Sequence, residues 1–205
     1  MMARWHIAPL LIVVIGCSRG PGRLRPPEVD AADATTAAIT ELDTDGDGKL
    51  AKAEWQKSGA LTAVSAAYDV NKDGALDTDE LRAGISNWQD NAVGPRPVPF
   101  SLKLDGQPLA GASVRLVPAA FMGDAIPGAT AETNSGGSGH LAMAEEDRPK
   151  NAPKMALVQP GLYNIEVTHP SKKIPVKYNT QTTLGIEITS SNPGPEGVVW
   201  SLSSK

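Results

Sequence analysis

Two short acidic stretches carry oxygen-bearing side chains at the same repeated spacing. Loop 1, residues 43–54, has the sequence Asp-Thr-Asp-Gly-Asp-Gly-Lys-Leu-Ala-Lys-Ala-Glu, and loop 2, residues 69–80, has the sequence Asp-Val-Asn-Lys-Asp-Gly-Ala-Leu-Asp-Thr-Asp-Glu. Both loops have oxygen side chains at positions 1, 3 and 5, glycine at position 6, an apolar residue at position 8 and glutamate at position 12. Calcium takes about six to eight oxygen ligands, and this spacing supplies them from one loop. The pattern therefore predicts two Ca²⁺ sites.

The predicted ligands are three side-chain oxygens, one backbone carbonyl and a glutamate that binds through both of its oxygens. In loop 1 they are Asp43, Asp45, Asp47, the carbonyl of Lys49 and Glu54. In loop 2 they are Asp69, Asn71, Asp73, the carbonyl of Ala75 and Glu80. Crowded carboxylates repel one another without a cation, so Ca²⁺ is expected to contribute to the folding free energy.

Other loop positions have expected structural roles. Gly48 is predicted to adopt a positive φ, where a Cβ would be strained. Leu50 is predicted to pair with Leu76 as a short strand segment. Asp77, at position 9 of loop 2, can orient a bridging water, whereas Ala51 at the same position of loop 1 cannot.

Both loops resemble the EF-hand family, and the flanking segments are predicted to be helices. The helical segments are expected at residues 33–42, 52–58, 61–68 and 79–88. Their apolar residues, including Leu81, Ile85 and Trp88, are expected to form the shared core of a paired EF-hand. Calcium sensors open a Met-rich groove, and residues 28–92 contain no methionine, which argues against an opening switch.

An alternative assignment is the dockerin family, which pairs two calcium loops on short helices. Only residues 55–68 separate the two loops, so the inner helices must be short, with a break at Ser58-Gly59. The start of loop 2, residues 69–74, resembles a dockerin loop. Dockerins usually have aspartate at position 12, however, and both loops here have glutamate. The EF-hand is the better match, and the alternative implies a calcium-dependent module that docks on another envelope protein.

The first residues predict export and lipid attachment. Residues 1–6 include Arg4, residues 7–15 are almost wholly apolar, and Gly16 precedes the single cysteine, Cys17. The apolar run is too short for a membrane span and has the length of a signal-peptide core. The segment resembles a bacterial lipoprotein signal, which implies removal of residues 1–16 and lipidation of Cys17. The expected location is the cell envelope, anchored to a membrane outside the cytoplasm, and Ser18 favours the outer membrane.

Charge divides the chain into two parts. Residues 28–92 carry 14 acidic and 5 basic side chains, whereas residues 93–205 carry 9 acidic and 10 basic ones. The acidity therefore belongs to the calcium loops and their helices. The chain has no basic patch with interleaved aromatic residues, so nucleic acid is not an expected partner.

After the Pro-rich residues 93–99, the apolar pattern alternates as it does in strands. Candidate strands are residues 100–104, 113–118, 129–133, 140–144, 161–168, 182–189 and 198–202. Turn signals such as Asp105-Gly106 separate most of them, and together they predict a small antiparallel sandwich. Residues 104–118, 159–167 and 174–179 resemble parts of carboxypeptidase regulatory-like domains, which implies a transthyretin-like fold for residues 100–204.

The sequence offers no catalytic motif. His140 and His169 lie outside the His-x-x-Glu and His-Glu-x-x-His patterns of zinc peptidases. No serine has the context of a nucleophile elbow, and no glycine-rich phosphate loop is present. We therefore expect a protein that is not an enzyme.

The predicted fold class is multidomain, with an all-α paired EF-hand followed by an all-β antiparallel sandwich. The expected order is a signal peptide (1–16), a flexible tether (17–29), an EF-hand pair (30–92), a Pro-rich linker (93–99) and the sandwich (100–204). The expected function is calcium binding by a lipid-anchored envelope protein. In this prediction Ca²⁺ acts mainly as a structural staple, and the sandwich is a spacer or interaction domain.

Overall fold

The computed structural model describes residues 24–205, so the predicted signal peptide and Cys17 lie outside the described part of the chain. Within it, the helical region consists of α1 (Ala31–Leu42), α2 (Lys52–Trp55), α3 (Gly59–Tyr68) and α4 (Thr78–Asn91). Each helix overlaps a predicted one. The largest differences are at α2, which ends three residues early, and at α4, which continues three residues further.

Three of these helices begin at a residue whose side chain accepts hydrogen bonds from the first free backbone amides. Asp30 caps α1, Ser58 caps α3 and Asp77 caps α4. Such caps satisfy donors that have no partner within the helix. Ala51, which precedes α2, has no side-chain oxygen to offer, and α2 has only four residues. The predicted break at Ser58-Gly59 is thus the capped start of α3.

The β region contains eight strands in two four-stranded sheets within the described residues. Sheet 1 is built on β1 (Pro99–Leu104), with β2 (Gln107–Pro108) and β5 (Ser138–His140) along one edge and β8 (Val198–Leu202) along the other. Sheet 2 has the order β4 (Ala129–Glu132), β3 (Ser113–Pro118), β6 (Gly161–Thr168) and β7 (Gly185–Ile188). Two short 3₁₀ helices, η1 (Ala120–Met122) and η2 (Val176–Tyr178), lie in the connections.

The predicted strands agree with the structure except at a few places. Strands β3, β6 and β8 have the predicted bounds, whereas β7 covers only half of the predicted range 182–189, β5 lies mostly before the predicted range 140–144, and β2 was not predicted. The prediction of antiparallel pairing throughout is wrong for one pair, because β1 and β8 run parallel, from Phe100↔Val198 to Leu104↔Leu202. Parallel neighbours need a long crossover connection, and here all of sheet 2 lies between them in the sequence.

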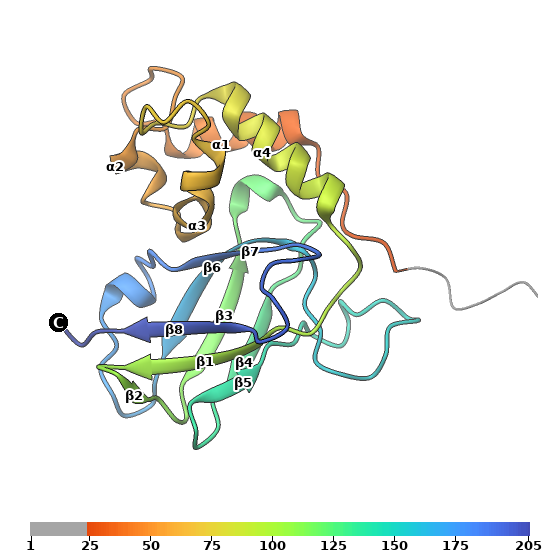
Figure 1. Cartoon of the computed structure of the whole chain (residues 1–205), viewed down its shortest axis with the longest axis vertical. Helices are drawn as coiled ribbons and strands as arrows, with labels where there is room; N and C mark the ends of the chain where they lie inside the picture. The colour runs from red at the N-terminus through yellow and green to blue at the C-terminus, as the bar shows by residue number, and fades with distance from the viewer. Residues whose placement is uncertain (1–23) are drawn as a thin grey trace, which may run out of the picture.

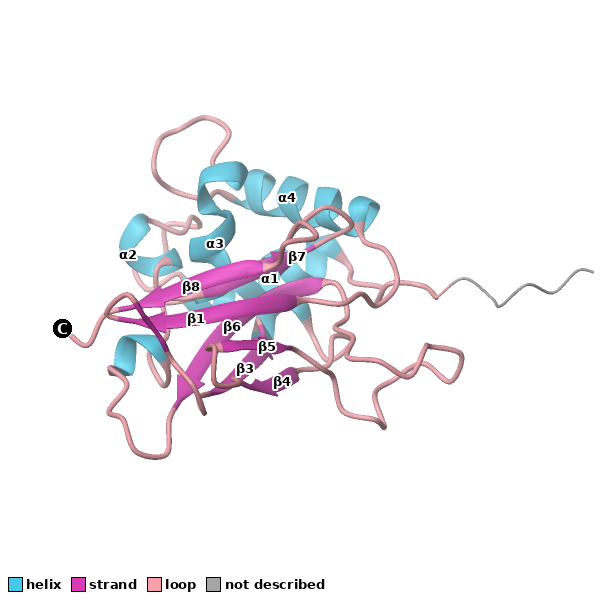
Figure 2. Cartoon of the chain, turned by 60° about the horizontal axis from the view of Figure 1, so that its bottom comes forward, coloured by secondary structure: helices cyan, strands magenta, loops and turns pink. Residues whose placement is uncertain are grey.

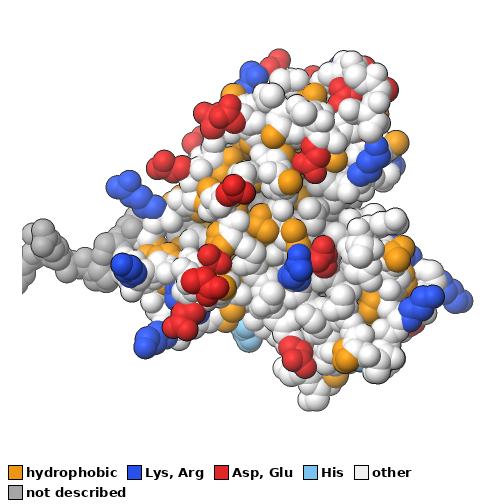
Figure 3. All heavy atoms as spheres, turned by 180° about the vertical axis from the view of Figure 1, so that it is seen from behind, with side chains coloured by type: hydrophobic (Ala, Val, Ile, Leu, Met, Phe, Trp, Pro, Cys, Tyr) orange, Lys and Arg blue, Asp and Glu red, His pale blue; other side chains and the backbone are white. Residues whose placement is uncertain are grey.

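The two sheets and the helices form three layers, with the helices over sheet 2 (Figures 1 and 2). Inward-facing residues such as Leu102, Leu116 and Ile165 are buried between the sheets. Strand β6 is buried along its inner face, and on its outer face Leu162 is buried and Asn164 is partly buried where the helical region packs on the strand. One continuous set of buried apolar residues joins both regions. Seen from behind, acidic side chains are spread over the upper part of the surface, which the helical region occupies (Figure 3).

The segments that were predicted to be flexible or hinge-like are bonded to the rest of the protein where the structure describes them. Arg96, in the Pro-rich linker, donates hydrogen bonds to the carbonyls of Thr189, Ser190 and Pro193 at 2.6–2.9 Å. Before α1, the Val29 amide donates to Gln89 of α4 at 2.9 Å. The linker is therefore fixed against the loop that follows β7. Among residues 24–205, no helix is long and apolar enough to cross a bilayer.

The Arg96 contacts predict a measurable contribution to stability. Replacing Arg96 with methionine removes three charge-assisted hydrogen bonds from the linker, and we expect the free energy of unfolding to fall by about 1–3 kcal/mol. Arg82→Met is the control, because Arg82 makes only an exposed ion pair with Asp79 at 3.6 Å, worth about 0.5 kcal/mol or less. Urea denaturation measures both, and equal effects of the two variants would contradict the proposed role of Arg96.

Candidate metal centre

The two acidic loops have the same backbone course. Loop 1 connects α1 to α2 and loop 2 connects α3 to α4. The position-6 glycines have positive φ, +82° at Gly48 and +86° at Gly74, which confirms the prediction for this bend. Position 4 is also left-handed, with φ of +77° at Gly46 and +61° at Lys72. The sequence analysis missed this second bend, although Gly46 was a signal for it.

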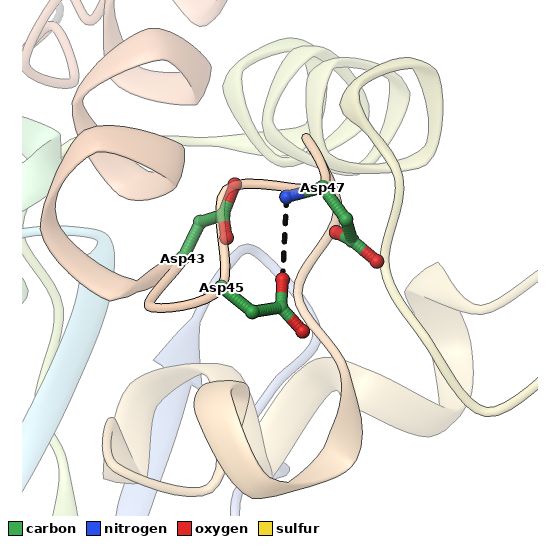
Figure 4. A group of neighbouring side chains, drawn as sticks. All are labelled: Asp43, Asp45 and Asp47. Carbon is green, nitrogen blue, oxygen red and sulfur yellow. Dashed lines mark hydrogen bonds between the residues drawn. The ribbon is translucent and has the colours of Figure 1, made fainter.

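The first three predicted ligands of loop 1 point toward one another (Figure 4). Asp43, Asp45 and Asp47 each offer a carboxylate oxygen, and these oxygens all lie within 4.8 Å of one another. Asp43 comes directly after α1, and all three side chains are at least partly exposed. Carboxylates at this separation repel one another, and a divalent cation between them would relieve the repulsion.

Backbone amides of each loop hold the position-1 carboxylate by both oxygens. Asp43 accepts hydrogen bonds from the amides of Gly46 and Gly48 at 2.7 and 2.9 Å. Asp69 accepts from Asp73 and Gly74 at 3.1 and 3.0 Å. The position-6 amide donates in both loops, whereas the second donor is at position 4 in loop 1 and at position 5 in loop 2.

The ligands predicted at positions 3 and 5 have matching contacts in the two loops. At position 3, Asp45 accepts from the Asp47 amide at 3.2 Å, and Asn71 accepts from the Asp73 amide at 2.8 Å. At position 5, Asp47 and Asp73 accept from the amides two residues further on, which are those of Lys49 and Ala75, at 2.8 and 2.9 Å. These turns orient the side-chain oxygens and also place the position-7 residues whose carbonyls were predicted as ligands.

The position-12 glutamate of loop 1 is buried and anchored at both of its oxygens. Glu54 is 4% exposed. One of its oxygens accepts from the amide and the hydroxyl of Thr44, at 2.6 and 2.8 Å, and the other accepts from the Ala51 amide at 2.9 Å. These bonds, chiefly that from the Thr44 amide, lower the pKa of Glu54 to about 2. The carboxylate is therefore charged at neutral pH and held against the start of its loop.

Loop 2 repeats this arrangement with an additional helix cap. Glu80 is 9% exposed, and it accepts from the amides of Val70 and Asn71 with one oxygen and from the Asp77 amide with the other, at 2.9–3.2 Å. Asp77 in turn accepts from the amides of Asp79 and Glu80. Asp77 and Glu80 thus form a capping box at the start of α4. The Asp-x-x-Glu spacing could have revealed this role from the sequence, which suggested only a water-orienting one.

The two loops lie side by side. Leu50 and Leu76 exchange two backbone hydrogen bonds of 2.9 Å, which confirms their predicted pairing. The Trp55 indole of α2 also donates to the carbonyl of Gly74 in loop 2, at 3.4 Å. The bound state of one loop can therefore influence the other through a shared two-stranded bridge.

One side chain that was not expected to matter connects the loops. The Lys49 ammonium lies 3.9 Å from a carboxylate oxygen of Asp73, and both side chains are about half exposed. Lys49 was predicted to act only through its carbonyl. Its ammonium instead neutralises part of the charge of a predicted ligand in the other loop.

The donors fit a hard, oxygen-preferring cation. Each loop offers carboxylate, amide or carbonyl oxygens and a buried glutamate, and neither predicted ligand set contains a nitrogen or sulfur donor. Oxygen ligands of this kind suit Ca²⁺ and Mg²⁺ rather than zinc. The number of oxygens and the flexible loop favour Ca²⁺, since Mg²⁺ demands a smaller, stricter octahedron.

Comparison with protein families agrees with this chemistry. The family model of the EF hand matches residues 37–57 and 66–85. These two ranges contain both loops in full, together with the parts of the helices that lie next to them. The match and the aspartate cluster support an EF-hand calcium-binding domain in the helical region. Neither the curated proteins nor the solved structures contain a significant match to the chain.

The Lys49–Asp73 ion pair predicts that calcium affinity can be raised. Removing the ammonium with Lys49→Met takes away a positive charge that competes with Ca²⁺ for Asp73. In a Glu54→Gln background, which isolates loop 2, we expect calcium binding to become about two- to fivefold tighter at low salt. Calorimetric titration measures this change, and added salt should reduce it. Lys103→Met on β1 is the control, and an unchanged dissociation constant in Lys49→Met would contradict the prediction.

Proposed function

We propose that the protein binds two Ca²⁺ ions, one in each loop, and that they act mainly as structural staples. The observation that carries this proposal is the matching set of hydrogen bonds in the two loops, each closed by a buried glutamate held against the start of its loop. The ligands would be those predicted from the sequence. Calcium would supply the positive charge that allows these carboxylates to share one small volume.

The packing of the helices favours a staple over a sensor. Leu81, Ile85 and Trp88 are 0% exposed. They belong to the continuous core that joins the helical region to the β region. A sensor would have to expose such a surface on binding calcium, and the methionines typical of that surface do not occur in residues 28–92.

The alternative function, a dockerin-like module that binds another envelope protein, has less support. It would be favoured by exposed apolar residues among Leu81, Ile85 and Trp88. These three side chains are buried against the protein's own core. We keep the staple as the leading proposal for this reason.

We also propose that the chain has no catalytic activity and that the β region serves as a spacer or interaction domain. His169 supports this view, since its ring accepts hydrogen bonds from the amides of Ser171 and Lys172 and faces the Ala110 carbonyl, so it braces two loops. The two four-stranded sheets are compatible with the carboxypeptidase regulatory-like, transthyretin-like fold that the resemblance of residues 104–118, 159–167 and 174–179 implies.

Calcium should stabilise the protein against heat. For each site, Ca²⁺ at about 100 times its dissociation constant contributes about 2.7 kcal/mol, which corresponds to a rise in Tm of about 5–10 °C for a protein of this size. Thermal melts of the full chain in calcium and in chelator measure the shift. Calorimetry should find two ions bound, and one in either Glu54→Gln or Glu80→Gln.

Magnesium at the same concentration is the control for general ionic effects, and it should shift the Tm less. A Tm that is the same in calcium and in chelator would rule out the staple.

We propose further that the protein is lipid-anchored through Cys17 in the cell envelope, on a tether that leads to α1. Expression in a bacterium fed with an alkyne-tagged fatty acid should label the wild-type protein and should not label Cys17→Ser, because the thiol is the expected acceptor. Membrane fractionation should show the variant released from the membrane. Equal labelling of the two proteins would contradict lipidation at this residue.

A further inference from the structure

Helix α3 approaches sheet 2 more closely than side chains would allow. A Cβ placed on Gly185 of β7 would lie 2.0 Å from the carbonyl oxygen of Gly59, the first residue of α3. A Cβ placed on Gly59 would lie 2.0 Å from the carbonyl oxygen of Leu184. Only glycine fits at either position. The start of α3 and the start of β7 therefore meet backbone to backbone.

The sheet also supplies an acceptor to the start of α3. The side-chain oxygen of Asn164, on β6, accepts from the Ala60 amide at 2.9 Å, and the Ser58 hydroxyl lies 3.5 Å from the same oxygen. The first amides of a helix have no partner within the helix. Sheet 2 thus completes the N-terminal cap of α3 from a residue that is 104 positions away in the sequence.

The C-terminal end of α3 contacts strand β7. Tyr68, its last residue, donates its hydroxyl to Glu187 of β7 at 3.3 Å. The Tyr68 ring also fills the space beside Gly84 of α4, where a Cβ would lie 2.4 Å from ring carbons. Burial raises the pKa of both Tyr68 and Glu187. Tyr68 therefore connects α3, α4 and β7 at one point.

Helix α4 contacts the end of β7. The Trp88 indole donates to the Ile188 carbonyl at 3.1 Å, and the Ser190 amide donates to the Asn91 carbonyl at 3.2 Å. Three of the four residues of β7 thus contact the helices, because Gly185 and Glu187 contact α3 and Ile188 contacts α4. The strand can make all these contacts only when α3 and α4 are held at one particular angle.

Loop 2 is the connection that sets this angle. Asp69, its first ligand, directly follows Tyr68, and Glu80, its last ligand, lies in the first turn of α4. We propose that Ca²⁺ in loop 2 and docking of the helical region on β6 and β7 stabilise each other, so that this sheet face is the intramolecular target of the EF-hand. This inference rests on the proposed function, because it requires calcium in loop 2.

Loop 1 should have a smaller effect on docking. The helix before it, α1, packs on α4 and on η1, and the helix after it, α2, packs on α3. Loop 1 therefore sets the angle between α1 and α2, and not the angle between α3 and α4, the two helices that β7 contacts. The two loops contact each other through the Leu50–Leu76 bridge, through the Trp55 and Lys49 contacts described above, and through the Thr78 hydroxyl, which donates to the Gly48 carbonyl at 3.4 Å.

Coupling between two events is reciprocal. If docking strengthens calcium binding in loop 2 by some factor, calcium strengthens docking by the same factor. Coupled sites typically change each other's affinity by about 5–150-fold. A variant that undocks α3 should weaken calcium binding by an amount in this range, although it leaves every ligand in place.

The test uses the full chain and the variant Gly185→Ala. The added methyl group would collide only with atoms of Gly59 and Ala60 among its three nearest neighbours. Gly194→Ala is the matched control, because nothing lies within 4 Å of its added Cβ and its φ is not left-handed. With loop 1 disabled by Glu54→Gln, calorimetry should show calcium binding at least fivefold weaker in Gly185→Ala and unchanged in Gly194→Ala.

Hydrogen exchange gives a second readout, which requires no substitution in the sheet. In the wild-type protein, Ca²⁺ should slow exchange of the amides in residues 58–62 and 184–190. Glu80→Gln should abolish this slowing, and Glu54→Gln should keep most of it. Tyr68→Phe removes one hydroxyl and leaves the ring in place, so it should reduce the slowing without unfolding the protein.

The outcomes separate the coupling from the proposed function. If the wild-type protein binds calcium but exchange at residues 184–190 does not respond and Gly185→Ala binds calcium as tightly as the control, the coupling is wrong and the staple survives. If the wild-type protein binds no calcium, both are wrong. Slowed exchange together with the loss of affinity in Gly185→Ala would establish the coupling.

Discussion

Repulsion between crowded carboxylates is the constraint that shapes the helical region. Asp43, Asp45 and Asp47 bring oxygens to within 4.8 Å of one another, and the loop tolerates this arrangement because its own amides donate to these side chains. Those bonds orient the oxygens but leave the negative charge in place. A cation is the remaining means of offsetting it, which is why loop geometry, the buried glutamates and calcium chemistry belong to one explanation.

The helical region and the β region share one hydrophobic core and are not two independent domains joined by a flexible linker. The Pro-rich segment is bonded through Arg96 to the loop after β7, and α3 meets β7 through two glycines. The two glycines allow this close approach. The hydrogen bonds of Asn164 with α3 and of Trp88 with β7 fix the orientation of the helices on the sheet. A calcium-binding region that is fastened in this way can contribute to the stability of the sheets.

Much of the candidate site could be predicted because its determinants lie within twelve consecutive residues. The spacing of Asp43, Asp45 and Glu54 and the bend at Gly48 are local properties, so the structure shows them where the pattern indicated. The strands β3, β6 and β8 were predictable for a similar reason, since alternation of apolar residues is visible within each segment. The parallel pairing of β8 with β1 was not, because alternation gives a strand its faces and not its neighbour.

The sequence by itself determined where oxygen-bearing side chains recur at calcium-loop spacing, which segments alternate and where helices must stop. Tertiary structure alone decided what those features contact. Gly59 was recognisable as a helix boundary, but its need to be glycine comes from Leu184 and Gly185 in the sheet. Lys49 was predicted as a carbonyl ligand, and its ammonium lies beside Asp73 of the other loop. The physical reason is that coordination spacing is set by the local chain, whereas packing depends on which distant surfaces meet.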